Sequence, residues 1–294
     1  MSFLIQQTLI YAVPLMIVAL AGVFAERSGI INLALEGIMI FGAFIGVLFV
    51  RQMQGLEVFN AAKAAGDWGT LQGLVLLAML VSAAMGALFS LLLSFASINL
   101  RADQTIGGTA LNLLATALAM VIAKGVNHSA SAKLDYSNRA FIYDFGPLTV
   151  NVFLFIGLVA LILSYIVLYK TRLGLRLRAC GEHPQAADSV GINVYKMRYI
   201  GVLISGVLGG IGGMAYIIPS VSSWNFEVGV SGAGFLALAV MIFGQWKPFR
   251  IFLAAVFFAL FKSLANIASS IPFLAELGEQ GLPWHELFDT DIEL

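Results

Sequence analysis

Residues 3–24 read FLIQQTLIYAVPLMIVALAGVF, an apolar stretch without a charged side chain. A helix needs about 20 mainly apolar residues to cross the hydrocarbon core of a bilayer. Similar runs predict further spans at 30–50, 71–97, 106–123, 148–169, 199–218, 232–246 and 250–270. The runs are continuous and do not alternate, which favours helices over the strands of a membrane barrel. We therefore predict an all-α fold, a polytopic membrane helix bundle of about eight transmembrane helices.

The composition supports a membrane protein. Of the 294 residues, 60% are hydrophobic and 11% are charged, whereas a soluble domain carries about 25% charged residues. This argues against a soluble enzyme and a disordered chain, and the single cysteine, Cys180, excludes a disulfide scaffold. The net charge of 0 provides no attraction for nucleic acid. We expect one transmembrane domain over 1–294, in the inner or plasma membrane of a cell, with the lipid bilayer as its surroundings.

Basic residues predict the orientation. The segment between the fifth and sixth spans is rich in them, and cytoplasmic loops carry an excess of Lys and Arg: Lys170, Arg172, Arg176, Arg178, Lys196 and Arg198. With this segment inside, alternation places four more on the same side: Arg27, Arg101, Lys247 and Arg250. The outside then receives Arg51, Lys63, Lys124, Lys133 and Arg139. This topology puts the N-terminus outside and leaves the side of the polar, acidic tail 276–294 open.

Two distant segments resemble each other. Residues 28–42 read SGIINLALEGIMIFG and residues 231–244 read SGAGFLALAVMIFG. In the predicted topology they run in opposite directions. Inverted-topology repeats are common in transporters, with the pathway between the halves. Alternatively, the match arises by chance, because Leu, Ala, Ile and Gly are abundant here.

Few polar side chains interrupt the apolar runs. Glu36 follows Asn32 by four residues, so both lie on one helix face, and Asn112 lies in the fourth span. Asn32, Glu36 and Asn112 are therefore candidates for a substrate pathway, although polar residues also lock helices together by hydrogen bonding. Lys262, in the last span, pairs with a carboxylate or extends to the interface if the span ends early.

Signatures of catalysis are weak. Gly229–Gly232 matches the G-x-S-G of intramembrane serine proteases, but a serine nucleophile needs a nearby base, and His128, His183 and His285 all fall in predicted loops or the tail. No phosphate-binding loop and no cluster of metal-ligand spacing occurs in the sequence. We expect neither catalysis nor a metal or cofactor in this chain.

The segment 170–198, KTRLGLRLRACGEHPQAADSVGINVYKMR, has features of a docking loop. Pro184 is a favourable first helical residue and Gly191 a favourable stop, which predicts a two-turn helix between them. Its alanines would leave a flat surface for a partner. Alternatively, the segment is a solvated basic loop that only sets the topology.

This loop resembles the coupling region of ABC-importer permeases, in which a short helix with two alanines, followed four residues later by glycine, docks on the ATPase. Ala186, Ala187, Gly191 and Ile192 match that pattern, after Pro184. Three further segments resemble the branch that includes permeases for branched-chain amino acids, ribose-type sugars and nucleosides: GVFAERSGIINLALEGIMIFGAF (22–44), RADQTIGGTALNLLATAL (101–118) and GAGFLALAVMIFGQWKP (232–248). The chain is most similar to the shorter permease of basic-membrane-protein-linked nucleoside importers, over roughly residues 5–270.

The resemblance implies a function and partners. The chain would be a permease subunit of an ATP-driven importer that moves its substrate by alternating access. Its partners would be a second, longer permease, cytoplasmic ABC ATPases and an extracytoplasmic substrate-binding protein. Nucleosides are the first candidate substrates, and sugars or branched-chain amino acids the alternatives. A single-chain secondary transporter is the alternative of another class. Such permeases usually end in another apolar span, from which the polar tail 276–294 departs.

Overall fold

The computed structural model describes residues 2–145 and 148–267, and the acidic tail 276–294 lies outside them. Within the described residues, seven helices are long and apolar enough to cross a membrane. They are α1 (Ser2–Arg27), α2 (Leu35–Gln54), α4 (Trp68–Ser94), α5 (Gln104–Asn127), α6 (Val152–Lys170), α9 (Val194–Ile217) and α11 (Pro248–Ile267). The predicted helical membrane bundle is confirmed.

The remaining apolar helix, α10 (Ala233–Phe243), is too short to span. It has 11 residues, and a rise of 1.5 Å per residue makes it about 16 Å long, roughly half of the hydrocarbon thickness. The predicted seventh span at 232–246 is therefore a half-length helix inside the bundle.

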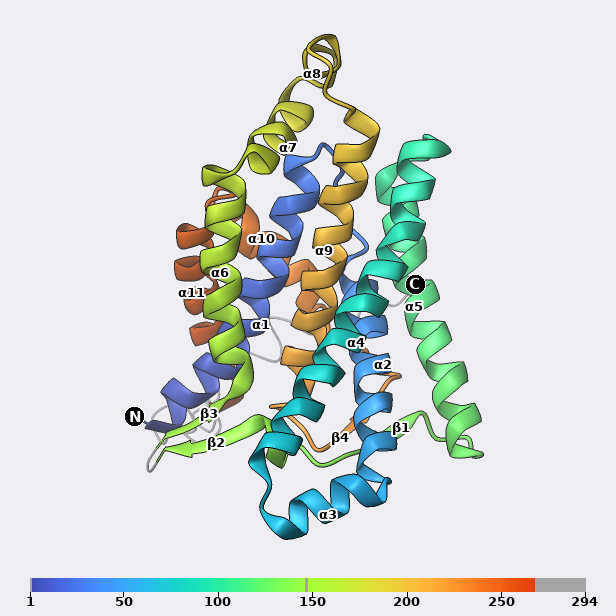
Figure 1. Ribbon diagram of the computed structural model, residues 1–294, viewed down its shortest axis with the longest axis vertical. Coiled ribbons are helices and arrows are strands. Elements are labelled where there is room, and N and C mark those ends of the chain that lie inside the picture. The colour runs from blue at the N-terminus through green and yellow to red at the C-terminus, as the bar shows by residue number, and fades with distance from the viewer. Residues whose placement is uncertain (1, 146–147, 268–294) are drawn as a thin grey trace, which may run out of the picture.

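The bundle has two different ends (Figure 1). One end carries α7 (Arg172–Glu182) and α8 (Pro184–Ser189), and we call it the α8 end. The opposite end, which we call the α3 end, carries the N-terminus, α3 (Glu57–Ala65) and two small antiparallel sheets. In one sheet β1 (Lys133–Asp135) pairs with β4 (Ser223–Asn225), and Leu134 lies opposite Trp224. In the other, β2 (Ile142–Phe145) pairs with β3 (Leu148–Asn151).

The second apolar run becomes helical later than its hydropathy predicts. Helix α1 ends at Arg27, and Gly29 adopts a left-handed φ of +89°. The Gly29 and Ile30 amides donate to the Glu26 and Ala25 carbonyls, at 2.9 and 3.2 Å. This pair of bonds is typical of a helix that stops at a glycine. The chain is then irregular up to Ala34, so the predicted span 30–50 is a helix only from Leu35.

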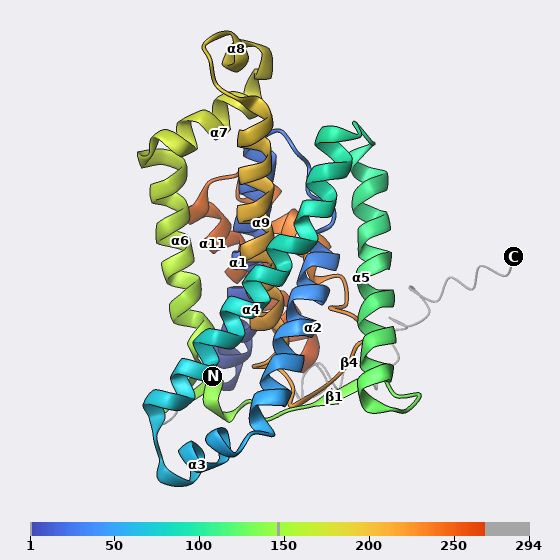
Figure 2. The ribbon, with the colours of Figure 1, turned by 45° about the vertical axis from the view of Figure 1, so that its right-hand side comes forward.

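Helix α9 lies in the middle of the bundle and packs against α1, α2 and α4 (Figure 2). Its glycines permit this close approach. A Cβ added at Gly210 would overlap the Ser82 carbonyl oxygen of α4, and one at Gly213 would overlap the Met39 carbonyl oxygen of α2. The Ser82 hydroxyl donates to the Gly42 and Gly210 carbonyls, at 2.9 and 2.8 Å. The glycine-rich span is thus a packing helix, as small residues in membrane helices predict.

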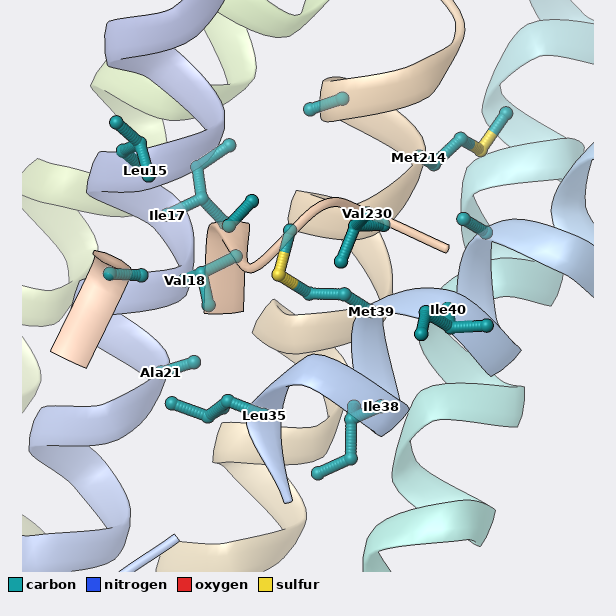
Figure 3. Close-up of a cluster of buried hydrophobic side chains, with 14 of the residues drawn as sticks. Leu15, Ile17, Val18, Ala21, Leu35, Ile38, Met39, Ile40, Met214 and Val230 are labelled. Atoms are coloured by element: carbon teal, nitrogen blue, oxygen red, sulfur yellow. The ribbon is translucent and has the colours of Figure 1, made fainter. Parts of the chain in front are cut away.

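The apolar core lies where α1, α2 and α9 meet the turn that precedes α10. Figure 3 shows side chains from all four elements pointing into this cluster, among them Ile17, Val18, Met39, Met214 and Val230. Each of these five is at most 1% exposed. The starts of α2 and α10 are therefore anchored in the most buried part of the molecule.

Candidate substrate pathway and coupling site

Helices α2 and α10 begin inside the bundle and run in opposite directions (Figure 1). Helix α2 leads from the bundle interior to α3, whereas α10 leads to Trp246, whose indole N–H donates to Glu26 near the end of α1 at 2.5 Å. These are the two segments that resemble each other in sequence, and their opposite directions are those that the inverted-repeat interpretation requires.

Glu36 joins the two helix starts. Its carboxylate accepts hydrogen bonds from the backbone amides of Gly232, at 2.9 Å, and Gly234, at 2.6 Å. The first N–H groups of a helix have no partner within the helix, and an acidic side chain satisfies them favourably. Gly234 is required by this close contact, because an added Cβ would lie 2.5 Å from the Glu36 backbone nitrogen. Glu36 is 9% exposed, so the first turn of α10 rests on a buried carboxylate.

The first turn of α2 is held by two amide side chains. Asn112 of α5 accepts from the Gly37 amide at 2.7 Å and donates to the Leu33 carbonyl at 2.9 Å. Asn32 accepts from the Ala34 amide at 3.1 Å and donates to the Ser205 hydroxyl of α9 at 2.8 Å. Each amide therefore uses both of its polar ends.

The three predicted pathway residues thus lie around one structural feature. Asn32 and Glu36 come from the segment that starts α2, and Asn112 is bonded to the same segment. Five of their six hydrogen bonds satisfy backbone groups at helix starts or in the irregular turn before α2, and the sixth joins that turn to Ser205 of α9. An unsatisfied backbone group in hydrocarbon costs several kcal/mol. These hydrogen bonds allow α2 and α10 to begin in the membrane interior without leaving these backbone groups unpaired.

Lys262 contacts aromatic side chains. Its ammonium group donates to the Tyr216 hydroxyl at 3.0 Å and lies 5.1 Å from the ring centroids of both Tyr11 and Tyr216. Among the described residues, the ion pairs join Arg27 to Glu182 and Lys124 to Glu227. Of the two alternatives for Lys262, pairing with a carboxylate is not found among the described residues. Sequence reasoning missed the two tyrosines, which only their positions within apolar runs could have indicated.

The predicted two-turn helix at the other site is present as α8, with Pro184 in its first turn. Its two alanines differ. Ala186 is exposed, whereas Ala187 is 3% exposed and packs with Cys180 and Met197. The expectation of one flat alanine surface is wrong for Ala187, because the helix needs an inward residue to attach it to α7 and α9.

The chain reverses after α8 at Gly191, which has a left-handed φ of +80°. The Ile192 amide donates to the Ala187 carbonyl at 3.1 Å, which closes the turn, and Ile192 packs beside Ala187. Val190, at this tip, is 73% exposed. Sequence reasoning overlooked this residue, although an apolar side chain next to a helix-stopping glycine was a signal for it. The outward surface of α8 is therefore formed by Gln185, Ala186, Asp188 and Ser189, together with Val190 directly after it.

Comparison with known proteins identifies the family. Residues 4–288 match the family described as branched-chain amino acid transport system / permease component. The guanosine ABC transporter permease protein NupQ of Bacillus subtilis is 40% identical over 288 residues, which cover 94% of this chain and 86% of the relative. The nucleoside ABC transporter permease protein NupC of Lactococcus lactis is 41% identical over 289 residues, with the same coverage of 94% and 86%.

A more distant relative carries another substrate in its name. A glucose ABC transporter permease protein of Haloferax volcanii is 24% identical over 289 residues, which cover 92% of this chain and 72% of the relative. No solved structure shows a significant match. The family match extends over nearly the whole chain, and the chain is a membrane permease component, not an enzyme. This protein therefore belongs to the branched-chain amino acid transport system permease family of ABC transporters.

Proposed function

We propose that this chain is a permease subunit of an ABC importer for nucleosides, and that it moves its substrate by alternating access. The similarity that carries the proposal is 40–41% identity, over 94% of the chain, to permeases named for guanosine and nucleosides. The glucose permease, at 24% identity, makes sugars the second candidate. Branched-chain amino acids, which give the family its description, are the third.

Uptake by the complete transporter tests the substrate. Cells that lack other nucleoside importers would produce the chain with its partner subunits and receive labelled guanosine, glucose or leucine. We expect ATP-dependent uptake of guanosine that unlabelled nucleosides inhibit and the other two compounds do not. Uptake of glucose or leucine without guanosine would contradict the nucleoside proposal.

An ABC transporter permease implies an ATPase and other transporter components. We assign these roles to a cytoplasmic ATPase, a second permease subunit and an extracytoplasmic substrate-binding protein. Support for the orientation comes from the basic residues, because the α8 end gathers the 170–198 segment with Arg27 and Arg101. An excess of Lys and Arg marks the cytoplasmic side. The α3 end and the N-terminus are then extracytoplasmic.

Cysteine labelling in intact cells tests this orientation. Cys180 is buried, and this burial raises the pKa of its thiol despite the opposing effect of Arg198. Its replacement by alanine gives a chain without cysteine, into which Ser189→Cys or Ser129→Cys is introduced. An impermeant maleimide should label only the cysteine at position 129, at the α3 end. Labelling at position 189 alone would reverse the topology.

We propose that the ATPase binds the outward surface of α8. Ala186 and Val190 would contact the ATPase, while Ala187, Gly191 and Ile192 would keep α8 in place. Ala186→Glu should reach the membrane in normal amount but lose both uptake and co-purification of the ATPase. Ala187→Glu should reduce the amount of folded permease, because it puts a charge between Cys180 and Met197. Normal uptake by Ala186→Glu would place the dock elsewhere.

We propose that the second permease lies against α5. Helices α6 and α11 lie on the opposite side of the bundle (Figure 2), and their exposed large residues are apolar: Phe155, Leu158, Ile162, Phe249, Leu253 and Phe257. The outward face of α5 is mixed, because it exposes the polar Thr105 and Thr109 beside apolar residues such as Ile106 and Leu113. Lipid favours a continuous apolar surface, and polar residues face protein or a water-filled pathway. Thr109→Cys should form crosslinks to the second permease, whereas Ile162→Cys should not.

A further inference from the structure

A pocket of about 270 Å³ opens near the α3 end, between α1, the end of α9 and the turn before α10. Its walls combine three aromatic side chains with three small polar ones: Tyr11, Tyr216 and Trp224, and Ser220, Asn225 and Ser231. None of its lining residues is acidic or basic. The pocket lies in the half of the bundle that faces the substrate-binding protein under the proposed function.

The aromatic walls are supported from behind. The rings of Tyr11 and Tyr216 are 6.3 Å apart and inclined by 53°. Lys262 lies over both rings and donates to the Tyr216 hydroxyl, so it fixes their positions. Trp224 packs against Phe226 at 4.2 Å between ring centroids and is only 8% exposed. The aromatic surfaces are therefore preorganised.

The polar side chains of the pocket can form hydrogen bonds with a ligand that packs against the aromatic side chains. The Ser220 hydroxyl donates to the Tyr216 carbonyl at 2.7 Å and can still accept a hydrogen bond. The Asn225 side chain accepts from the Glu227 amide at 3.2 Å and donates to the Glu227 carboxylate at 3.4 Å, and its second N–H can donate to a ligand. A ligand that suits this pocket is uncharged, with a planar ring on one part and hydroxyl groups on the other.

We propose that this pocket binds the nucleoside on its way into the bundle, with the base against the tyrosines and the ribose towards Ser220 and Asn225. The inference rests on the proposed nucleoside function and adds a binding site to it. Stacking of a base on an aromatic side chain contributes about 1–3 kcal/mol, and every base has such a face. The site would therefore accept several nucleosides.

The pocket also borders the start of α10. Gly229 and Ser231 line it, and Gly232, the next residue, donates to Glu36. Gly229, Ser231 and Gly232 all have left-handed φ angles, of +59°, +53° and +74°. A bound nucleoside would thus contact the turn that leads into α10 and is bonded to Glu36 of α2.

Binding of labelled guanosine to the purified permease–ATPase complex, without the substrate-binding protein, tests the site. Tyr11→Leu should raise the Kd on the order of tenfold, because it removes a stacking surface, whereas Tyr11→Phe should leave it nearly unchanged. Tyr165→Leu, which removes a tyrosine from α6 outside the pocket, is the matched control. Free guanine should compete better than ribose, and Tyr11→Leu should abolish that difference.

A second variant distinguishes loss of binding from misfolding of Tyr11→Leu. Val228 lines the pocket and is 64% exposed, so Val228→Trp adds bulk without removing a packed side chain. It should also raise the Kd. A wild-type Kd in both Tyr11→Leu and Val228→Trp, or guanosine uptake with no saturable binding to the wild-type complex, would overturn the pocket and leave the nucleoside function intact. Absence of guanosine uptake by the wild-type transporter would instead contradict the nucleoside function.

Discussion

Helices α2 and α10 begin in the same region of the bundle, but different kinds of side chain hold their first turns. The start of α2 is bonded by two neutral amides, Asn32 and Asn112. The start of α10 is bonded by the carboxylate of Glu36. The relation is not reciprocal, because α2 supplies the residue that holds α10 and the described part of α10 supplies no side chain to the α2 start.

This difference shows that the sequence similarity of the two segments does not determine how they are bonded to each other. The shared letters SG, LAL and MIFG lie in two segments, each of which leads into a helix that starts inside the bundle. The two helices run in opposite directions. The unshared Glu36 joins the two segments, because its carboxyl group accepts from the Gly232 and Gly234 amides. The connection between the two helix starts therefore depends on a position at which the segments differ.

Loss of the Glu36 carboxylate should have the largest effect. Glu36→Leu leaves two buried amides at the start of α10 without an acceptor, and each hydrogen bond to a charged group contributes about 1.5–3 kcal/mol. We expect a destabilisation of about 3 kcal/mol or more, with loss of uptake. Thermal unfolding of the purified complex and uptake in cells measure these effects.

The matched variant is Glu36→Gln. Its amide keeps the shape and one acceptor oxygen, so its effects should lie between those of the wild type and Glu36→Leu. If Glu36→Leu assembles and transports normally, the carboxylate does not hold α10, and the contrast between the two helix starts is wrong.

Loss of the Asn112 amide should have a smaller effect. Asn112→Leu removes the acceptor of the Gly37 amide and the donor to the Leu33 carbonyl, both neutral groups. We expect a destabilisation of about 1–3 kcal/mol, measured as a lower unfolding temperature. The control is Thr116→Val on the same helix, whose hydroxyl bonds to the Asn112 backbone carbonyl within α5. An Asn112→Leu effect larger than that of Glu36→Leu would invert the ranking.

Ser205 should matter less again. Ser205→Ala removes the acceptor of one Asn32 N–H but leaves the bond from the Ala34 amide to Asn32 in place. We expect a destabilisation of about 1 kcal/mol, by the same measurement. The exposed Ser222 provides the control, Ser222→Ala, which should unfold at the wild-type temperature.

The smallest effect should arise at a helix start on the surface. Asp103 accepts from the Ile106 and Thr105 amides at the start of α5, and these bonds lower its pKa. Its contribution is therefore present above the unfolded-state pKa and disappears as the pH falls through the lowered folded-state pKa. Asp103→Ala should lower the unfolding temperature slightly at pH 7, and the difference should vanish in acid. A difference that grows in acid would contradict this role.

The sequence predicted the features that have local signals, but it did not predict those that depend on contacts inside the bundle. Apolar runs predicted the spans, and Pro184 with Gly191 predicted α8, because these signals are local. Hydropathy could not predict that the run after Gly29 stays irregular up to Ala34, because it does not detect the helix stop. The predicted span 232–246 was also too long, because α10 stops at Phe243, before Gly244.

The sequence also did not show which side chains of a helix point inward. Ala186 and Ala187 are identical letters, and only packing against Cys180 distinguishes them. Tyr11 and Tyr216 are 205 positions apart in the chain and meet only in the folded bundle. Residues that function through distant partners cannot be identified from their neighbours in sequence.

The bond between Glu36 and α10 also sets an order of events during synthesis. Its partners lie 196 and 198 positions further along the chain, which the ribosome needs on the order of 10 to 40 s to produce at about 5–20 residues per second. Until then α2 must remain inserted with its carboxyl group unpartnered. A charged side chain costs about 3 kcal/mol on insertion scales, and each Leu, Ile, Phe or Val offsets about 0.3–0.6 kcal/mol. The dense apolar run that follows Glu36 therefore keeps the nascent helix in the membrane until α10 is made.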